Sequence, residues 1–191
     1  MNREHDPHAE VPVRGMVYAA MFGAATAAGA WLIIPLPPVP VTLQTFFMAL
    51  AATLLGPRLG AMSQGVYVLL GIMGLPVFSG GKAGLGVLLG PTGGYLVGFV
   101  AGAWLIGMLL RGGGRPGPFR IAPAVMAGYL LVYALGVSGL CLVARLSLVE
   151  AVSVGVLPFL LGDALKAAAV TVLTVKLQDR IRLGPGSRGL P

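Results

Sequence analysis

Six long apolar segments limit how this chain can fold more than any other feature of its sequence. An α-helix needs about 20 apolar residues to cross the hydrocarbon core of a bilayer. Only 10% of the 191 residues are charged, against roughly 25% in ordinary soluble domains, and a soluble core this small does not bury so much apolar surface. We therefore predict an all-α integral membrane protein, a bundle of six transmembrane helices at 16–34, 41–55, 59–73, 93–110, 121–144 and 154–177.

The basic residues between these segments predict the orientation of the bundle, because cytoplasmic loops are enriched in Lys and Arg. With the N-terminus in the cytoplasm, ten of the thirteen Lys and Arg residues lie inside, Lys82 and Arg145 lie outside, and Lys166 lies within a span. An odd number of helices would remove this asymmetry. We expect both termini to be cytoplasmic, as tails at 1–15 and 179–191 on a six-helix membrane domain at 16–178.

The net charge of +7 does not indicate a nucleic-acid partner, because the chain has no basic helix and no aromatic platform on a polar face. Motifs for enzymatic chemistry are also missing. The glycines around Lys82 depart from a phosphate-binding loop, since residue 83 is alanine, and no nucleophile motif or cysteine/histidine metal cluster is present. We predict no catalytic residue, metal or cofactor. If the chain takes part in active transport, the energy must come from an ion gradient or another subunit.

Asp163 and Lys166 are the only charged residues well inside a predicted span. Each costs about 2.5–3.5 kcal/mol at the centre of an inserting helix, and their spacing of three residues places both on one side of that helix. One interpretation is a structural ion pair, and the other is a polar site for a ligand. At about 1.5 Å per residue, Asp163 lies roughly 10–15 Å below the outer surface, a depth that suits a pocket reached from outside.

Further candidate features lie near the predicted outer face, at the start of the second segment and in two connections. The second segment opens with Thr42, Gln44 and Thr45, whose side chains either bind a ligand or cap the helix, and capping is favoured for Thr42. Four prolines between residues 35 and 40 predict an extended, stiff connection. The apolar, glycine-rich connection at 79–92 is predicted to fold over the bundle as a lid.

Small residues repeat every four positions in two segments, a pattern that lets another helix pack closely. The ladder Gly94–Gly98–Gly102 is interpreted as packing within the chain. The first segment carries two alanine-rich ladders, one through Ala20 and Ala24 and one through Ala19 and Gly23. For these, packing within the chain and packing against a partner subunit are equally favoured.

Three stretches together resemble the BioY family, the biotin-specific S components of energy-coupling-factor (ECF) transporters. They are residues 34–46, residues 74–81 followed by 90–95, and the Gly-Asp-Ala-Leu-Lys run at 162–166. The resemblance implies a six-helix bundle that binds one biotin near its outer face. In that site Asp163 would accept from the ureido N–H groups, and Lys166 would donate to the ureido oxygen or hold Asp163 ionised. Lys82 would meet the biotin carboxylate, with secondary contacts from Gln44, Thr45 and Tyr95.

The same resemblance implies partners and a location. S components dock on a transmembrane coupling subunit and a pair of ATPases, which agrees with the absence of a nucleotide motif here. The docking surface would be the small-residue stripe at Ala20 and Ala24. The protein would then be a multi-pass protein of a prokaryotic plasma membrane and not an enzyme.

Three alternatives to a biotin S component differ in what they require. An S component for another vitamin would differ in the three signature stretches. A self-sufficient secondary carrier for a small vitamin-like substrate would use Asp163 as a proton or sodium site, but the chain shows no convincing inverted repeat. A membrane enzyme with Asp163 as base would need a nucleophile or metal partner that the surrounding sequence lacks.

Overall fold

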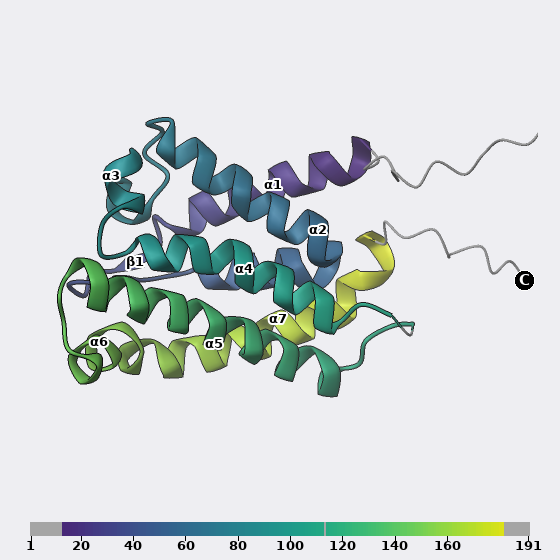
Figure 1. Ribbon diagram of the computed structural model, residues 1–191. Helices are drawn as coiled ribbons and strands as arrows, with labels where there is room; N and C mark the ends of the chain where they lie inside the picture. The colour runs from purple at the N-terminus through teal and green to yellow at the C-terminus, as the bar shows by residue number, and fades with distance from the viewer. Residues whose placement is uncertain (1–12, 113, 182–191) are drawn as a thin grey trace, which may run out of the picture.

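A computed structural model describes residues 13–112 and 114–181, so most of the two predicted tails lies outside the described residues. The long helices run side by side, and the short elements gather at one end of the bundle (Figure 1). The elements in order are α1 Val13–Gly29, β1 Ile33–Ile34, β2 Val41–Thr42, α2 Gln44–Ile72, η1 Ser79–Gly81, α3 Leu85–Leu88, α4 Gly93–Leu109, α5 Pro118–Val143, α6 Leu148–Gly155, η2 Leu157–Phe159 and α7 Leu160–Ile181.

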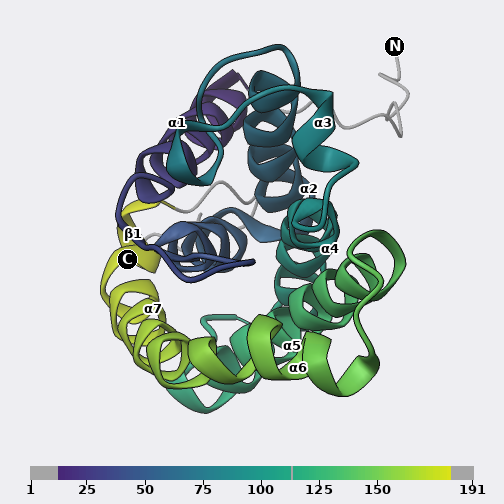
Figure 2. The same ribbon diagram turned by 90° about the vertical axis from the view of Figure 1, so that its left-hand side faces the viewer.

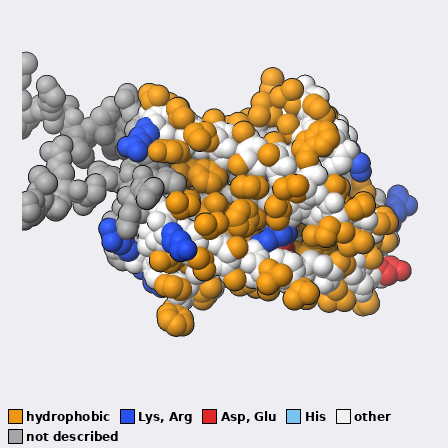
Figure 3. Space-filling model, turned by 180° about the vertical axis from the view of Figure 1, so that it is seen from behind, with side chains coloured by type: hydrophobic (Ala, Val, Ile, Leu, Met, Phe, Trp, Pro, Cys, Tyr) orange, Lys and Arg blue, Asp and Glu red, His pale blue; other side chains and the backbone are white. Residues whose placement is uncertain are grey.

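Membrane-spanning character is visible in the described helices. Three helical stretches are long and apolar enough to cross a membrane, Gln44–Ile72, Pro118–Val143 and Leu148–Gln178, and Gly93–Leu109 is a shorter apolar helix. Hydrophobic side chains cover much of the face shown in Figure 3, whereas Lys and Arg lie mainly near its ends. This distribution confirms the prediction of a mainly helical protein with an apolar exterior.

The helix α2 reverses direction at Gly56, where φ is 80° and ψ is −174°. The side chains of Gln44 and Tyr67 hydrogen-bond across 23 positions, although a continuous helix rising about 1.5 Å per residue would hold them roughly 35 Å apart. Pro57 follows directly and suits the first position of the returning helix. The two segments predicted at 41–55 and 59–73 are therefore joined by a tight turn rather than a loop.

The first half of α2 lies at the centre of the molecule, surrounded by α1, the second half of α2, α4, α5 and α7 (Figure 2). Its residues from Met48 to Ala52 are all buried. The returning half packs closely on it, because a Cβ on Gly60 would lie 2.8 Å from the Cα of Ala52. A central apolar helix of this kind is the core around which the other helices are arranged.

The predicted start of the second segment is wrong by three residues. Val41 and Thr42 form a β-strand instead, paired antiparallel with Ile34 and Ile33 respectively. The prolines between the two strands have no N–H to continue a helix, so the chain stays extended on both sides of them. The helix α1 ends at Gly29 and does not reach the predicted end at residue 34, where Ile33 and Ile34 form β1 instead.

The predicted sixth segment at 154–177 is not one continuous helix. A capping box between Ser147 and Glu150 begins α6, and the chain then breaks into the short 3₁₀ turn η2 before α7 begins at Leu160. Pro158 lies in this turn and cannot supply the N–H that an unbroken helix needs. As a result, Asp163 lies in the first turn of α7 rather than inside a longer helix.

Glycine ladders set the helix packing as predicted for α4. A Cβ would lie 2.2 Å from Leu135 O at Gly94, 2.9 Å from Val132 Cα at Gly98 and 3.0 Å from Gly128 O at Gly102. The first two distances are shorter than real Cβ contacts, and the third is unusually tight, so these three glycines let α4 and α5 pack along their backbones. The interpretation of this ladder as packing within the chain is confirmed.

The two ladders of α1 lie on different faces of the helix. Ala19 and Gly23 are buried, and a Cβ on Gly23 would lie 2.8 Å from Ser63 O in the returning half of α2. By contrast, Ala20, Ala24 and Ala28 are exposed. One ladder therefore packs within the chain, and the other leaves a small-residue stripe on the outer surface of the bundle.

Candidate ligand-binding site

A pocket lies at the end of the bundle where the β-hairpin, the segment 79–92 and the η2 turn meet. Its polar side chains come from β2, α2, α4, α5, α7 and the segment 79–92, and its apolar side chains come from the turn of the β-hairpin, the segment 78–87, α4, α5 and η2. The segment 79–92 lines it through Ser79, Lys82, Val87 and Thr92, as expected for a lid. The apolar walls include Phe78, Leu96, Phe99, Val132 and Phe159.

Asp163 is the most heavily hydrogen-bonded acceptor of the pocket and is only 2% exposed. Its Oδ1 accepts from Lys166 Nζ at 2.7 Å and from Thr45 Oγ1 at 3.0 Å, and its Oδ2 accepts from the Tyr133 hydroxyl. Its position in the first turn of α7 places the negative charge at the positive end of the helix dipole. A carboxylate offers about four acceptor sites, so Asp163 retains room for roughly one more donor.

Lys166 is almost as buried and is fully engaged. Its Nζ donates to Asp163 Oδ1 at 2.7 Å, to the carbonyl oxygen of Thr42 at 2.7 Å and to Thr45 Oγ1 at 3.1 Å. An ammonium group has three donors, so no donor of Lys166 is left for a ligand in this arrangement. Of the two roles implied for Lys166, the geometry therefore supports pairing with Asp163 rather than donating to a ureido oxygen.

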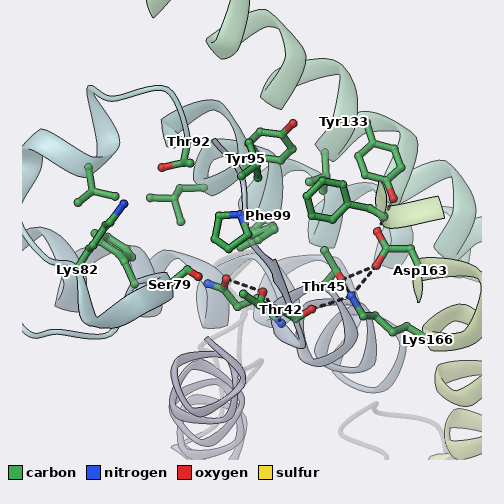
Figure 4. A pocket seen from close by; sticks show the side chains of 18 residues that line it. Thr42, Thr45, Ser79, Lys82, Thr92, Tyr95, Phe99, Tyr133, Asp163 and Lys166 are labelled. Carbon is green, nitrogen blue, oxygen red and sulfur yellow. Dashed lines mark hydrogen bonds and ion pairs between the residues drawn. The ribbon is translucent and has the colours of Figure 1, made fainter. Parts of the chain in front are cut away.

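The two interpretations of the Asp163–Lys166 pair are both realised in part. The pair is a buried ion pair with an N···O distance of 2.7 Å, and both side chains also line the pocket. A buried ion pair is tolerated only when its remaining hydrogen-bonding groups are satisfied. Thr45 and Tyr133 do this on the side of Asp163, and the Thr42 carbonyl does it on the side of Lys166 (Figure 4).

Thr42 and Gln44 hold the start of α2 against the pocket. The Thr42 hydroxyl accepts from the backbone N–H of Gln44 at 3.3 Å and donates to Gln44 Oε1 at 2.8 Å. The N-cap position of α2 is Leu43 and makes no side-chain cap, so Thr42 contacts the first residue of the helix without being its N-cap. The Gln44 amide in turn donates to the hydroxyl of the fully buried Tyr67. Each of these bonds fixes a side chain that lines the pocket.

The remaining predicted site residues lie around the same cavity. The ring of Tyr95 lines it, but its hydroxyl donates to the carbonyl of Gly155 at 2.8 Å and thereby ties α4 to α6. Lys82 is exposed at the lid end, opposite Asp163 in Figure 4, and it has no side-chain hydrogen bond or ion pair among the described residues. Close to it, the buried Ser79 hydroxyl has no partner in the described part of the chain.

The structure adds Tyr133, which sequence reasoning missed. Tyr133 and Tyr129 lie one helical turn apart on a buried face of α5, and Tyr129 donates to the backbone carbonyl of Thr45 at 3.3 Å. Two tyrosines four residues apart in an otherwise apolar span were a usable signal, because a buried hydroxyl needs a partner. What the sequence does not show is that this partner is Asp163.

A sequence profile described as the BioY family matches residues 1–183 of the chain. The chain belongs to the BioY family. Among curated members, it is 43% identical to "Biotin transporter BioY" of Thermotoga maritima, over 87% of this chain and 96% of that protein. It is 39% identical to "Probable biotin transporter BioY" of Pyrococcus horikoshii, over 83% of this chain and 93% of that protein.

The fold also matches a solved structure. That structure is the S component for biotin from an ECF-type ABC transporter, and the superposition gives a TM-score of 0.79. The two share 30% sequence identity, and the match covers 88% of this chain and 92% of the other. The helical arrangement described above is therefore an S-component fold, and the proteins to which this BioY-family chain is similar are named as transporters.

Proposed function

We propose that this BioY-family chain is the biotin-binding S component of an ECF-type vitamin uptake transporter. The observation that carries the proposal is a pocket with unlike polar ends. Asp163, with spare acceptor capacity, is buried at one end, and the cation Lys82, with no described partner, lies at the other. The names of the relatives and the S-component fold support the same conclusion.

The chemistry of biotin fits these two ends. Its ureido ring carries two N–H donors, and a buried carboxylate such as Asp163 is a strong acceptor for one of them. Its carboxylate is an anion on a short apolar chain, which suits Lys82 at the mouth of the pocket. Between the two, the apolar bicycle would lie against Phe99 and Phe159, as in most small-molecule sites. Gln44, Thr45 and the ring of Tyr95 are proposed as secondary contacts.

The proposal includes the topology of the chain. Six transmembrane helices within residues 16–178 are supported by the reversal in α2, which turns one helical stretch into two antiparallel halves. Cytoplasmic termini, with tails at 1–15 and 179–191, are supported by the basic residues at the end of the bundle away from the pocket. The membrane would be the plasma membrane of a prokaryote.

The proposed partners are a transmembrane coupling subunit and two ATPase subunits. The sequence of this chain has no phosphate-binding loop, so ATP hydrolysis would be carried out by the ATPase subunits. The exposed stripe of Ala20, Ala24 and Ala28 on α1 is the proposed docking surface. Small side chains there would let a partner helix approach the backbone of α1 closely.

Calorimetric titration of biotin into the purified, detergent-solubilised protein tests the proposed function. We expect tight binding of one biotin per chain and no heat from riboflavin or thiamine at the same concentrations. A lack of biotin binding is informative only if the protein is folded. A single symmetric peak in gel filtration and a cooperative thermal transition would establish that it is folded. Folded protein that binds riboflavin or thiamine but not biotin would overturn the choice of vitamin while keeping the S-component fold.

Replacing Lys82 with alanine is expected to weaken biotin binding by about tenfold. A charge-assisted hydrogen bond at a partly exposed site contributes about 1–1.5 kcal/mol. Binding of biotin amide, which lacks the carboxylate charge, should be unchanged by the substitution, and Lys82→Arg should retain most of the affinity for biotin. Titrations with both ligands check this. An equal loss for biotin and its amide would show that Lys82 does not face the carboxylate.

A further inference from the structure

A second cavity, of about 310 Å³, lies at the opposite end of the bundle from the biotin pocket. It is formed where α2 reverses direction at Gly56 and Pro57, beneath the end of α4 and beside the last turns of α7. Most of its lining is apolar and includes Leu54, Leu55, Leu59 and Leu110. The proposed function does not use this cavity.

One side of the cavity carries a positive charge with no described counter-charge. Arg111 lines it and is exposed, and its guanidinium has no hydrogen bond or ion pair with any described residue. The two acidic residues whose side chains the structure describes, Glu150 and Asp163, both lie at the other end of the bundle. Further basic side chains surround this end, at Arg14, Arg58, Arg115, Arg120 and Lys176. The charged side chains that the structure describes at this end are therefore all basic, and they favour an anion at the cavity.

The cavity also offers an acceptor that lacks a donor. Gln178 lines it, and its Oε1 is buried without a hydrogen-bond partner in the described part of the chain, while its Nε2 donates to Val175 O at 3.4 Å. The other polar side chain of the lining, Thr53, is already paired with Thr174 at 2.7 Å. Leaving a buried acceptor without a partner is unfavourable, so a ligand that brings a donor to Gln178 is favoured.

These features together describe a ligand with an anion, a neighbouring hydrogen-bond donor and an apolar body. We propose that the cavity binds an anionic phospholipid. Its phosphate lies on Arg111, a headgroup hydroxyl donates to Gln178, and its acyl chains cover the leucines. Basic pockets between membrane helices are suited to anionic lipid headgroups. A free phosphate ion would satisfy Arg111 but would leave the leucine lining unused, which favours a lipid as the source of the phosphate.

Native mass spectrometry of the full-length protein tests this site. The protein is released from mixed micelles that contain phosphatidylglycerol or, separately, phosphatidylcholine, and the retained lipid is counted. We expect one tightly held phosphatidylglycerol and little phosphatidylcholine. Arg111→Ala should lower retention of phosphatidylglycerol by about fivefold, since one basic side chain near a lipid contributes about 1 kcal/mol. Gln178→Leu should reduce the preference for phosphatidylglycerol over phosphatidic acid, which has no headgroup hydroxyl.

Matched variants keep the test specific. Arg120→Ala removes an exposed basic residue from the same end of the protein without altering the cavity lining, and it should retain phosphatidylglycerol like wild type. Leu110→Trp keeps every charge but fills the cavity, and it should release the lipid. Biotin titration serves as the folding check, because its pocket lies at the other end. Three results would each overturn the proposal. They are equal retention of phosphatidylglycerol by wild type and Arg111→Ala, a loss of phosphatidylglycerol in Arg120→Ala as large as in Arg111→Ala, and retention of glycerol phosphate, which has no acyl chains, as tightly as the lipid.

Discussion

Replacing Asp163 with asparagine is expected to weaken biotin binding by about 100-fold, which corresponds to roughly 2.7 kcal/mol. Asparagine keeps the shape of the side chain but removes its charge and exchanges one acceptor oxygen for a donor. Both oxygens of Asp163 already accept from protein donors, Lys166 and Thr45 on Oδ1 and Tyr133 on Oδ2. An amide group therefore cannot serve these donors and a ureido N–H together. Hydrogen bonds to a charged group contribute about 1.5–3 kcal/mol each, which supports an effect of this size.

Calorimetric titration of biotin into wild type and Asp163→Asn measures the effect. Glu150→Gln is the matched control, because Glu150 is exposed, caps α6 and does not line the pocket. That variant should bind biotin with unchanged affinity. An affinity of Asp163→Asn within about threefold of wild type, less than 1 kcal/mol, would remove Asp163 from the binding site and leave it a structural role only.

Replacing Lys166 with methionine is expected to destabilise the fold by about 3–5 kcal/mol, the usual cost of leaving one partner of a buried ion pair without the other. The ammonium group of Lys166 is the only described cation that contacts Asp163, and it also binds the Thr42 carbonyl and Thr45. Its removal leaves an unpaired carboxylate between α2, α5 and α7. The free energy of unfolding in detergent, followed by circular dichroism during denaturation, checks this.

The double variant Asp163→Asn/Lys166→Met separates the structural role of the pair from its role in binding. With both charges removed, most of the lost stability should return, because replacing a whole buried pair is often nearly neutral. Biotin binding should not return, since the acceptor for the ureido group is still missing. A double variant that binds biotin like wild type would mean that the pair only holds the helices together. An unfolding free energy that is unchanged in Lys166→Met would mean that the pair contributes nothing to stability.

The lengths and polarity of the helices were accessible from sequence because they depend on neighbouring residues along the chain. Apolar runs of membrane-spanning length, the glycine ladder of α4 and the shared side of Asp163 and Lys166 all follow from local hydropathy and from the period of the α-helix. Gln44, Thr45, Lys82 and Tyr95 were also selected from sequence, in part through a family resemblance, and all four line the pocket.

Boundaries were less accessible where proline and glycine compete with apolar periodicity. Apolar residues continue through the break at η2 and through the hairpin strands, so hydropathy alone predicts one helix across the first and a helical start within the second. Pro158 and the prolines between β1 and β2 decide otherwise. The break at η2 has a consequence for function, since it places Asp163 at the start of a helix.

Local sequence is enough to establish an apolar helical protein with one acidic and one basic group on a shared face of a membrane helix. What surrounds these two groups depends on the packing of distant segments. Lys166 reaches the carbonyl of Thr42, which lies 124 positions away in the chain, and Asp163 meets Tyr133 from a different helix. The reversal at Gly56 also forms the second cavity. Such contacts depend on how whole helices pack, because the partners are distant in sequence and no local pattern records which faces will meet.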